Sequence, residues 1–147
     1  MNVLITGGAG YIGSSVSHLL LDKGHQVTII DNLSTGSIKN IPKKATFHKI
    51  DISDRKKLNK IFNEKKYDIV FHFAALINNE ESIKYPKKYF ENNFIKGKIF
   101  IENCIKNKVN KFIYSSTAAV YGNKNKRVNE KDNLNPMSPY PKSKLKL

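Results

Sequence analysis

Apolar residues gather in five short runs, and longer segments of mixed polarity lie between them. The runs cover residues 2–6, 26–31, 46–50, 68–74 and 111–115. Runs of this length that are rich in branched and aromatic residues are typical of strands buried on both faces of a sheet. The pattern therefore predicts five strands of a parallel sheet.

The segments between these runs carry apolar residues at helical spacing. Helices are expected over residues 14–23, 55–64 and 87–108, and residues 78–85 are interpreted as helical or looped. Gly24 is a suitable stop for the first helix, and Ser53 or Asp54 can cap the second. Strands that alternate with helices predict an α/β fold with a doubly wound parallel sheet, a Rossmann fold.

The first apolar run ends in a glycine cluster, Gly7-Gly8-Ala9-Gly10-Tyr11-Ile12-Gly13, and an amphipathic segment follows at once. A strand, a glycine turn and a helix in this order can hold a dinucleotide pyrophosphate. Gly7 or Gly8 permits a tight turn, Gly10 lets the backbone approach the phosphates, and Gly13 lets the helix pack closely. The N–H groups at the helix start would then face the phosphates.

The second run ends on Asp31, which lies 18 residues after Gly13. An acid at this distance can accept hydrogen bonds from the adenosine ribose and would repel a 2′-phosphate, which favours NAD over NADP. The alternative role for Asp31 is to start a turn before Asn32.

Further candidate residues follow the other predicted strands. Asp51 follows the third strand, Phe73 to Ala75 close the fourth, and Ser115 to Thr117 follow the fifth. Ligands of doubly wound sheets bind beyond the carboxyl ends of the strands, so these residues are expected near one site. His72, inside the fourth strand, is interpreted as a packed and hydrogen-bonded residue.

Near the end of the sequence, Tyr140 and Lys144 have the i, i+4 spacing that places two side chains on one helix face. A free tyrosine has a pKa of about 10, and a neighbouring ammonium favours its phenolate. Tyr140 could then exchange a hydroxyl proton while a hydride moves to or from the cofactor. Pro141 is compatible with the first turn of a helix.

The composition bears on whether the protein is a membrane, secreted or nucleic-acid-binding protein. The chain has 147 residues, of which 39% are hydrophobic, and it contains neither an apolar run of membrane-spanning length nor a signal-peptide pattern at Met1. A cytoplasmic protein without a membrane partner is expected.

Cys104 is the single cysteine, so no intrachain disulfide can form. The net charge of +14 comes from lysines spread along the chain, which favours solvated helix faces over a nucleic-acid partner. No metal is expected.

Several further motifs accompany these residues, and together they carry a family resemblance. The chain resembles the N-terminal part of the extended short-chain dehydrogenase/reductases of the NAD-dependent epimerase/dehydratase family, and within it the epimerases that act at C4 of UDP-glucose. The matching segments are residues 6–13, 31–36, 51–52, 72–76, 81–82, 92–93, 115–122, 138–140 and 143–145. Ala118 and Ala119 stand where related dehydratases carry an acid, which argues against dehydration.

The resemblance implies NAD as the cofactor and the interconversion of UDP-glucose and UDP-galactose through a 4-keto sugar. Tyr140 would be the acid–base residue, Thr117 would bind the 4-hydroxyl, and Lys144 would hold the nicotinamide ribose. The full-length protein would be a homodimer. The cofactor-binding residues that the resemblance and the motifs imply are Gly7, Gly10, Tyr11, Ile12, Gly13, Asp31, Asn32, Ser34, Thr35, Gly36, Asp51, Ile52, Phe73, Ala74, Ala75, Asn92, Tyr140 and Lys144.

The chain departs from the family pattern at three points. Pro141 replaces a usual glycine, Ile77 stands where some members have a lysine, and the sequence stops at Leu147, inside the predicted helix that bears Lys144. Residues 1–147 are therefore interpreted as an NAD-binding Rossmann domain that is incomplete at its C-terminal end, truncated before the substrate domain and inactive alone. The alternatives are an epimerase of UDP-N-acetylhexosamines or UDP-uronates, a non-catalytic NAD-binding module, and a nucleic-acid binder driven by charge.

Overall fold

The computed structural model describes residues 1–147, and they form two compact units. The first unit comprises Met1–Ala74 and Ile99–Ser115, and the second comprises Ala75–Lys98 and Ser116–Leu147.

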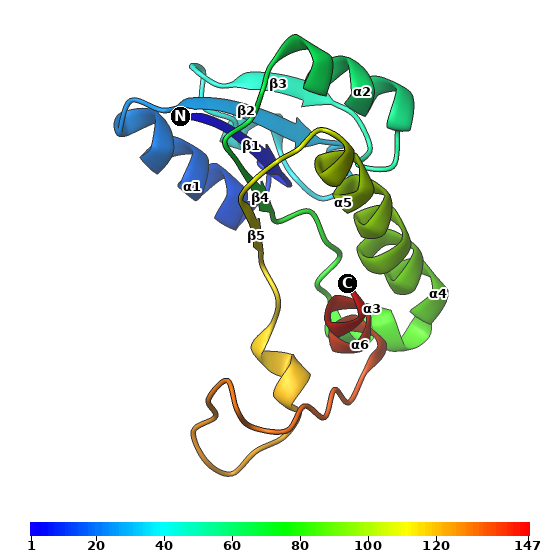
Figure 1. Cartoon of the computed structure of the whole chain (residues 1–147). Helices are drawn as coiled ribbons and strands as arrows, with labels where there is room; N and C mark the ends of the chain where they lie inside the picture. The colour runs from blue at the N-terminus through cyan, green and yellow to red at the C-terminus, as the bar shows by residue number, and fades with distance from the viewer. The chain divides into compact units, whose positions relative to one another are not determined.

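The first unit contains a parallel sheet of five strands in the order β3-β2-β1-β4-β5 (Figure 1). The chain winds outward from β1 to β3 and then crosses to β4 on the other side of β1, as the doubly wound prediction required. The strands are β1 (Asn2–Thr6), β2 (Gln26–Asp31), β3 (Thr46–Lys49), β4 (Ile69–His72) and β5 (Phe112–Tyr114).

Two apolar cores cover opposite faces of this sheet. On one face, Leu4 and Ile30 pack with Leu58 and Phe62 of α2 (Arg55–Glu64) and with α5 (Gly97–Lys106). The other face packs against α1 (Tyr11–Asp22). A short 3₁₀ turn, η1 (Ile38–Asn40), follows β2 in the chain. Val3 and Ile5 of β1 thus enter one core and Leu4 the other, which explains why three successive residues of this strand are apolar.

Helix α1 begins three residues earlier than the apolar spacing indicated. Tyr11 and Ile12 are 87% and 54% exposed, so the inward pattern starts only after the backbone has become helical. The helix ends as expected at Gly24, whose φ of 77° is favourable for glycine. Helix α2 has the predicted bounds, and Asp54 is its cap, because its carboxylate accepts the N–H of Lys57 at 3.0 Å.

The second unit is built from short helices. The segment predicted as a helix over 87–108 is helical from Pro86 to Lys106, two residues short of the predicted end, and its part from Ile99 on belongs to the first unit. Its middle is a π-helical segment that the apolar spacing did not indicate. The elements here are α3 (Asn79–Lys84), α4 (Pro86–Tyr89), the π-helical η2 (Phe90–Lys96), the 3₁₀ turn η3 (Ala118–Tyr121) and α6 (Pro139–Lys146).

Candidate active site

The glycine turn after β1 is as tight as its sequence suggested. Gly7 has φ 71°, and a Cβ on it would lie 2.6 Å from the backbone nitrogen of Ala74. A Cβ on Gly13 would overlap the carbonyl oxygen of Gly7, so only glycine lets α1 start this close to the turn. Gly10 differs, because the one atom near its Cβ position is the Gly7 oxygen at 3.3 Å. The turn is therefore closed at Gly7 and Gly13 and open at Gly10.

The start of α1 suits an anion. Gly10 precedes the helix and brings no capping side chain, while Tyr11 and Ile12 point outward. The first N–H groups of a helix lack intrahelical partners and carry partial positive charge. A pyrophosphate fits this arrangement, because Gly10 leaves space above the turn and the helix supplies the donors.

Asp31 ends β2 beside this turn and is 8% exposed. One carboxylate oxygen accepts the N–H of Ala9 at 3.0 Å, and the other accepts the N–H of Leu33 at 2.8 Å. Each oxygen retains a second acceptor position. Asp31 therefore braces the glycine turn and starts the next turn, while its carboxylate can still accept a hydroxyl.

The loop after β2 folds back on the glycine turn. A Cβ on Gly36 would lie 2.8 Å from the Cβ of Ala9, so a larger residue would push the two segments apart. The Ser37 N–H and the Asn40 amide both donate to the Ala9 carbonyl, at 3.0 and 2.9 Å. Asn32, Ser34 and Thr35, which precede these anchors, are exposed.

The ends of β3 and β4 complete this edge of the first unit. Asp51 accepts the Asn32 amide at 3.1 Å and the Ser53 hydroxyl at 2.6 Å. Ile52 turns its side chain into the core. After β4, the Ala74 N–H donates to the Thr6 hydroxyl at 3.3 Å, and Phe73 is half-buried. The predicted residues of this unit thus follow the carboxyl ends of β1 to β4.

His72 has the packing role that the sequence suggested. It is 1% exposed, and its Nδ1 shares a 2.6 Å hydrogen bond with the Thr6 hydroxyl. Its ring stacks on Phe100 with 5.3 Å between centroids. These contacts give His72 a place in the core.

In the second unit, Tyr140 and Lys144 lie one turn apart on α6, as their spacing predicted. Tyr140 is half-buried, whereas Lys144 is 3% exposed. Burial lowers the pKa of Lys144 to about 8, because removal from water disfavours the ammonium. Pro141 lies in the first turn of the helix, where its missing N–H interrupts no helical hydrogen bond.

The remaining predicted residues of this unit lie outside α6. Thr117 precedes η3, and its hydroxyl accepts the Ala119 N–H at 3.2 Å. Asn92 lies in the π-helical segment, and its amide donates to the side chain of Asn93 at 3.1 Å. Ala75 is half-buried at the start of the unit.

Three side chains hold α6 in place, and the sequence analysis named them only as parts of matching segments, without a role. The Tyr140 N–H donates to the hydroxyl of Ser82 at 3.1 Å. Ser143 bonds both the Tyr140 carbonyl and the amide of Asn93. Ser82, Asn93 and Ser143 lie in the matching segments 81–82, 92–93 and 143–145, but these motifs do not indicate which backbone groups the side chains bond.

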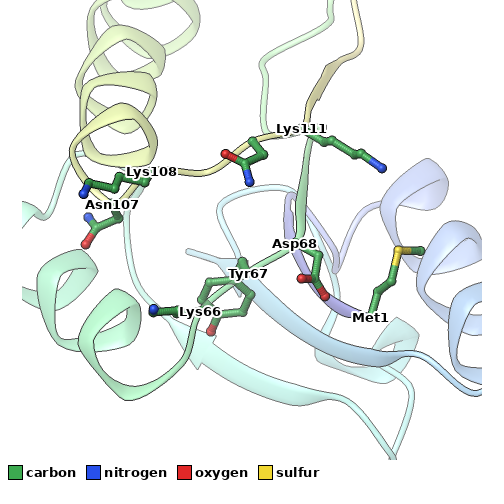
Figure 2. Close-up of a pocket in the computed structure, with 8 residues that line it drawn as sticks. Met1, Lys66, Tyr67, Asp68, Asn107, Lys108 and Lys111 are labelled. Atoms are coloured by element: carbon green, nitrogen blue, oxygen red, sulfur yellow. The ribbon is translucent and has the colours of Figure 1, made fainter.

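A separate hollow of about 870 Å³ lies at the amino-terminal edge of the sheet, lined by Met1, Lys66, Tyr67, Asp68, Asn107, Lys108, Asn110 and Lys111 (Figure 2). The side chains of Lys66 and Lys108 extend to one side of this hollow and that of Lys111 to the other, so their charges do not converge. Asp68 is engaged with the backbone N–H of Asn2 at 2.7 Å. The hollow therefore lacks the convergent polar groups of a binding site.

Comparison with known proteins gives the family. The model of the NAD dependent epimerase/dehydratase family matches residues 3–147. The chain belongs to this family. It is 40% identical over 146 residues to the UDP-glucose 4-epimerase of Halalkalibacterium halodurans, covering 99% of this chain and 43% of that protein.

Solved structures agree with the family assignment. The UDP-Glc/GlcNAc 4-epimerase from Campylobacter jejuni is 41% identical with a TM-score of 0.93, over 99% of this chain and 46% of that one. The Thermus thermophilus UDP-glucose 4-epimerase in complex with NAD is 37% identical with a TM-score of 0.93, over 98% of this chain and 47% of that one. The chain thus spans less than half the length of these relatives. No helix in the structure combines the length and the apolar composition needed to cross a bilayer.

Proposed function

We propose that the protein carrying this chain is an NAD-dependent epimerase that inverts C4 of a UDP-sugar, with UDP-glucose and UDP-galactose as the pair interconverted. The observation that carries the proposal is the pair Tyr140 and Lys144 on α6, with the lysine 3% exposed. The family assignment and the relatives named above support the reaction class.

The first unit would bind NAD. The open turn at Gly10 and the first N–H groups of α1 would take the pyrophosphate, and Asp31 would accept hydroxyls of the adenosine ribose. Further contacts from this unit would come from the loop residues Asn32, Ser34, Thr35 and Gly36, from the backbone of Asp51 and Ile52, and from Phe73 and Ala74. In the second unit, the family resemblance assigns cofactor contacts to Ala75 and Asn92.

The second unit would move the proton. NAD, when bound, supplies reversible acceptance of a hydride from C4. Tyr140 would take the proton of the 4-hydroxyl and later return it, and Thr117 would hydrogen-bond the same oxygen. The Lys144 ammonium, one turn further along α6, would stabilise negative charge on the Tyr140 oxygen and hold the nicotinamide ribose. The resulting 4-keto sugar would present its other face before it is reduced again.

The deciding experiment compares two tyrosines in the protein that carries this chain. Tyr140→Phe removes the acid–base hydroxyl and keeps the ring, so UDP-glucose turnover should fall by about two to four orders of magnitude while NAD still binds. Tyr85→Phe removes the hydroxyl of a tyrosine that is 58% exposed, and it serves as the matched control. Near-normal turnover by Tyr140→Phe would contradict the proposal.

The same assays distinguish this proposal from two alternative functions. The Campylobacter jejuni relative, described as a UDP-Glc/GlcNAc 4-epimerase, makes a UDP-N-acetylhexosamine the first alternative substrate. A higher kcat/KM for that sugar than for UDP-glucose would select it. NAD binding without turnover of any UDP-sugar would instead indicate a non-catalytic NAD-binding module.

A further inference from the structure

The loop of residues 123–134 lies between two residues to which the proposed function gives a part in the reaction. Thr117 precedes η3, ahead of the loop, and Tyr140 follows the loop on α6. The loop is the orange segment that precedes the red helix α6, and its residues 123–131 are exposed (Figure 1). An exposed loop of this kind moves easily and would not by itself hold Thr117 and Tyr140 at a fixed separation.

Backbone contacts close the loop at its base. The Asn135 N–H donates to the Val120 carbonyl at 2.8 Å. Gly122 lies opposite Asn135 with φ 68°, and a Cβ on it would overlap the Asn135 carbonyl oxygen. Glycine adopts this φ without strain and leaves room for that oxygen, whereas any other residue meets both obstacles. The contacts of Val120 and Gly122 with Asn135 are called the clasp below.

On the side of Thr117, the clasp continues into a bonded turn. The Thr117 hydroxyl accepts the Ala119 N–H at 3.2 Å, and the Thr117 carbonyl accepts the Val120 N–H at 3.2 Å. The Gly122 N–H donates to the Ala119 carbonyl at 3.1 Å. Val120 is buried, so the residue whose carbonyl takes part in the clasp is also anchored by packing. Thr117 is therefore tied to the clasp through η3.

On the side of Tyr140, the chain between the clasp and α6 is short and stiff. Pro136 follows Asn135 directly, and Pro139 opens α6 immediately before Tyr140. A proline fixes its own φ and restricts the backbone of the residue before it. Ser138, which precedes Pro139, is buried. A displacement of Asn135 is therefore passed on to Tyr140, because little of it can be absorbed between them.

We infer that Gly122 is a positioning residue, which closes the clasp and so sets where Thr117 lies relative to Tyr140. The route between the two along the chain runs through the whole loop, whereas the route across the clasp needs only residues 117–120 and 135–140. The inference rests on the proposed function, which gives Thr117 and Tyr140 the same substrate oxygen. Two groups that bond one oxygen must keep their geometry to within about 0.5 Å for full activity.

The clasp is tested first without catalysis, by amide hydrogen exchange at Asn135 in the protein that carries this chain. Gly122→Ala places a methyl group against the Asn135 carbonyl, so exchange of the Asn135 N–H should rise about tenfold. Gly24→Ala is the matched control, because Gly24 has φ 77° and nothing lies within 4 Å of its Cβ position. This control imposes the same kind of backbone strain without the overlap and should leave Asn135 unchanged. Unchanged Asn135 exchange in Gly122→Ala, or an equal rise in both variants, would overturn the inference.

Kinetics then test the consequence for the reaction. In Gly122→Ala, kcat should fall about tenfold while KM for UDP-glucose stays within about twofold, and Gly24→Ala should keep both. If Gly122→Ala does not fold, Asn135→Pro removes the N–H donor of the clasp and should lower kcat alike. Replacement of residues 124–131 by glycine and serine alters the loop and spares the clasp, so kcat should be kept. Unchanged kcat with the clasp broken, or a tenfold loss in the loop replacement, would overturn the positioning role.

A double-mutant cycle separates positioning from general destabilisation. Thr117→Val removes the hydroxyl that the clasp is inferred to place. Added to Thr117→Val, Gly122→Ala should lower kcat by only about twofold more, because that hydroxyl is no longer there to be positioned. Equal losses from Gly122→Ala with and without the Thr117 hydroxyl would overturn the inference. An unmutated protein that turns over no UDP-sugar, with Asn135 exchange raised by Gly122→Ala alone, would refute the proposed function and support the clasp.

Discussion

Tyr89 and Tyr140 pack edge to face, with 6.4 Å between ring centroids and 75° between ring planes. Tyr89 is fully buried, and its hydroxyl donates to the Glu81 carboxylate at 2.8 Å. Lys88 bonds the other oxygen of that carboxylate at 2.6 Å. The ring that faces Tyr140 is therefore itself fixed at its far end by a charged pair.

Tyr89→Phe tests the hydrogen bond without removing the ring. Burial, together with the Glu81 carboxylate, raises the pKa of Tyr89 to about 12. Since the folded state then holds this proton more tightly than the unfolded state, Tyr89 contributes stability that is present below about pH 10 and is lost as pH rises towards 12. The variant should lose about 1 kcal/mol at pH 7, the usual worth of a hydrogen bond, and its stability should fall less between pH 10 and 12. Urea unfolding across this range measures both effects, and an unchanged alkaline limb would contradict the assigned role.

Lys144→Met tests a pH dependence of the unfolding free energy that is opposite in sign to that of Tyr89. Burial lowers the pKa of Lys144 to about 8, so between about pH 8 and its unfolded value of 10.5 the unfolded state binds more protons than the folded one. Stability attributable to Lys144 therefore rises with pH across that window, and the charged lysine is unfavourable below it. The difference in unfolding free energy between Lys144→Met and the unmutated protein should favour the variant at pH 7 and shrink as pH approaches 10.5. A difference that is constant with pH would show that Lys144 titrates normally.

The sheet could be predicted because each strand carries its own signal. All residues of β1 after Asn2 and all residues of β2 after Gln26 are buried, and a continuous apolar run satisfies two cores at once. The π-helical turn at Asn93 could not be predicted from apolar spacing, because the residue of this segment that is buried, Asn93, is polar and adds nothing to the apolar pattern. The support of Tyr140 by Ser82 and Ser143 was equally hidden, since these contacts join residues 58 positions apart in one case and 3 in the other.

Two glycines of the turn have different expected roles: Gly13 in packing and Gly10 in binding the cofactor. Gly13→Ala places a methyl group against the Gly7 carbonyl, so the first turn of α1 must shift, and the protein should lose about 1–3 kcal/mol of stability. Gly10→Ala meets only the Gly7 oxygen at 3.3 Å and should fold almost normally, yet its methyl group would occupy the surface proposed for the pyrophosphate. We expect Gly10→Ala to retain its unfolding midpoint and to bind NAD at least tenfold more weakly. Calorimetric titration and thermal unfolding on the same samples distinguish the two outcomes, and undiminished NAD affinity in Gly10→Ala would place the pyrophosphate elsewhere.

Asp31 offers the sharpest test of cofactor choice, because its carboxylate has two roles that one substitution can separate. It braces the turn by accepting the N–H groups of Ala9 and Leu33, and we propose that it also accepts a ribose hydroxyl and repels a 2′-phosphate. Asp31→Asn removes the negative charge while it keeps one carbonyl oxygen for the turn. The ratio of the NADP and NAD dissociation constants should therefore fall by about tenfold, which corresponds to about 1.4 kcal/mol.

Asp22→Asn supplies the matched control for Asp31→Asn, because it removes the same charge at an exposed position at the end of α1. This variant should leave the NADP to NAD ratio unchanged. If the general charge of the molecule set the preference, both variants would change the ratio alike, since each raises the net charge by one. If the unmutated protein bound NAD and NADP equally well, Asp31 would retain only its structural role, as a brace that holds the Ala9 N–H in the glycine turn.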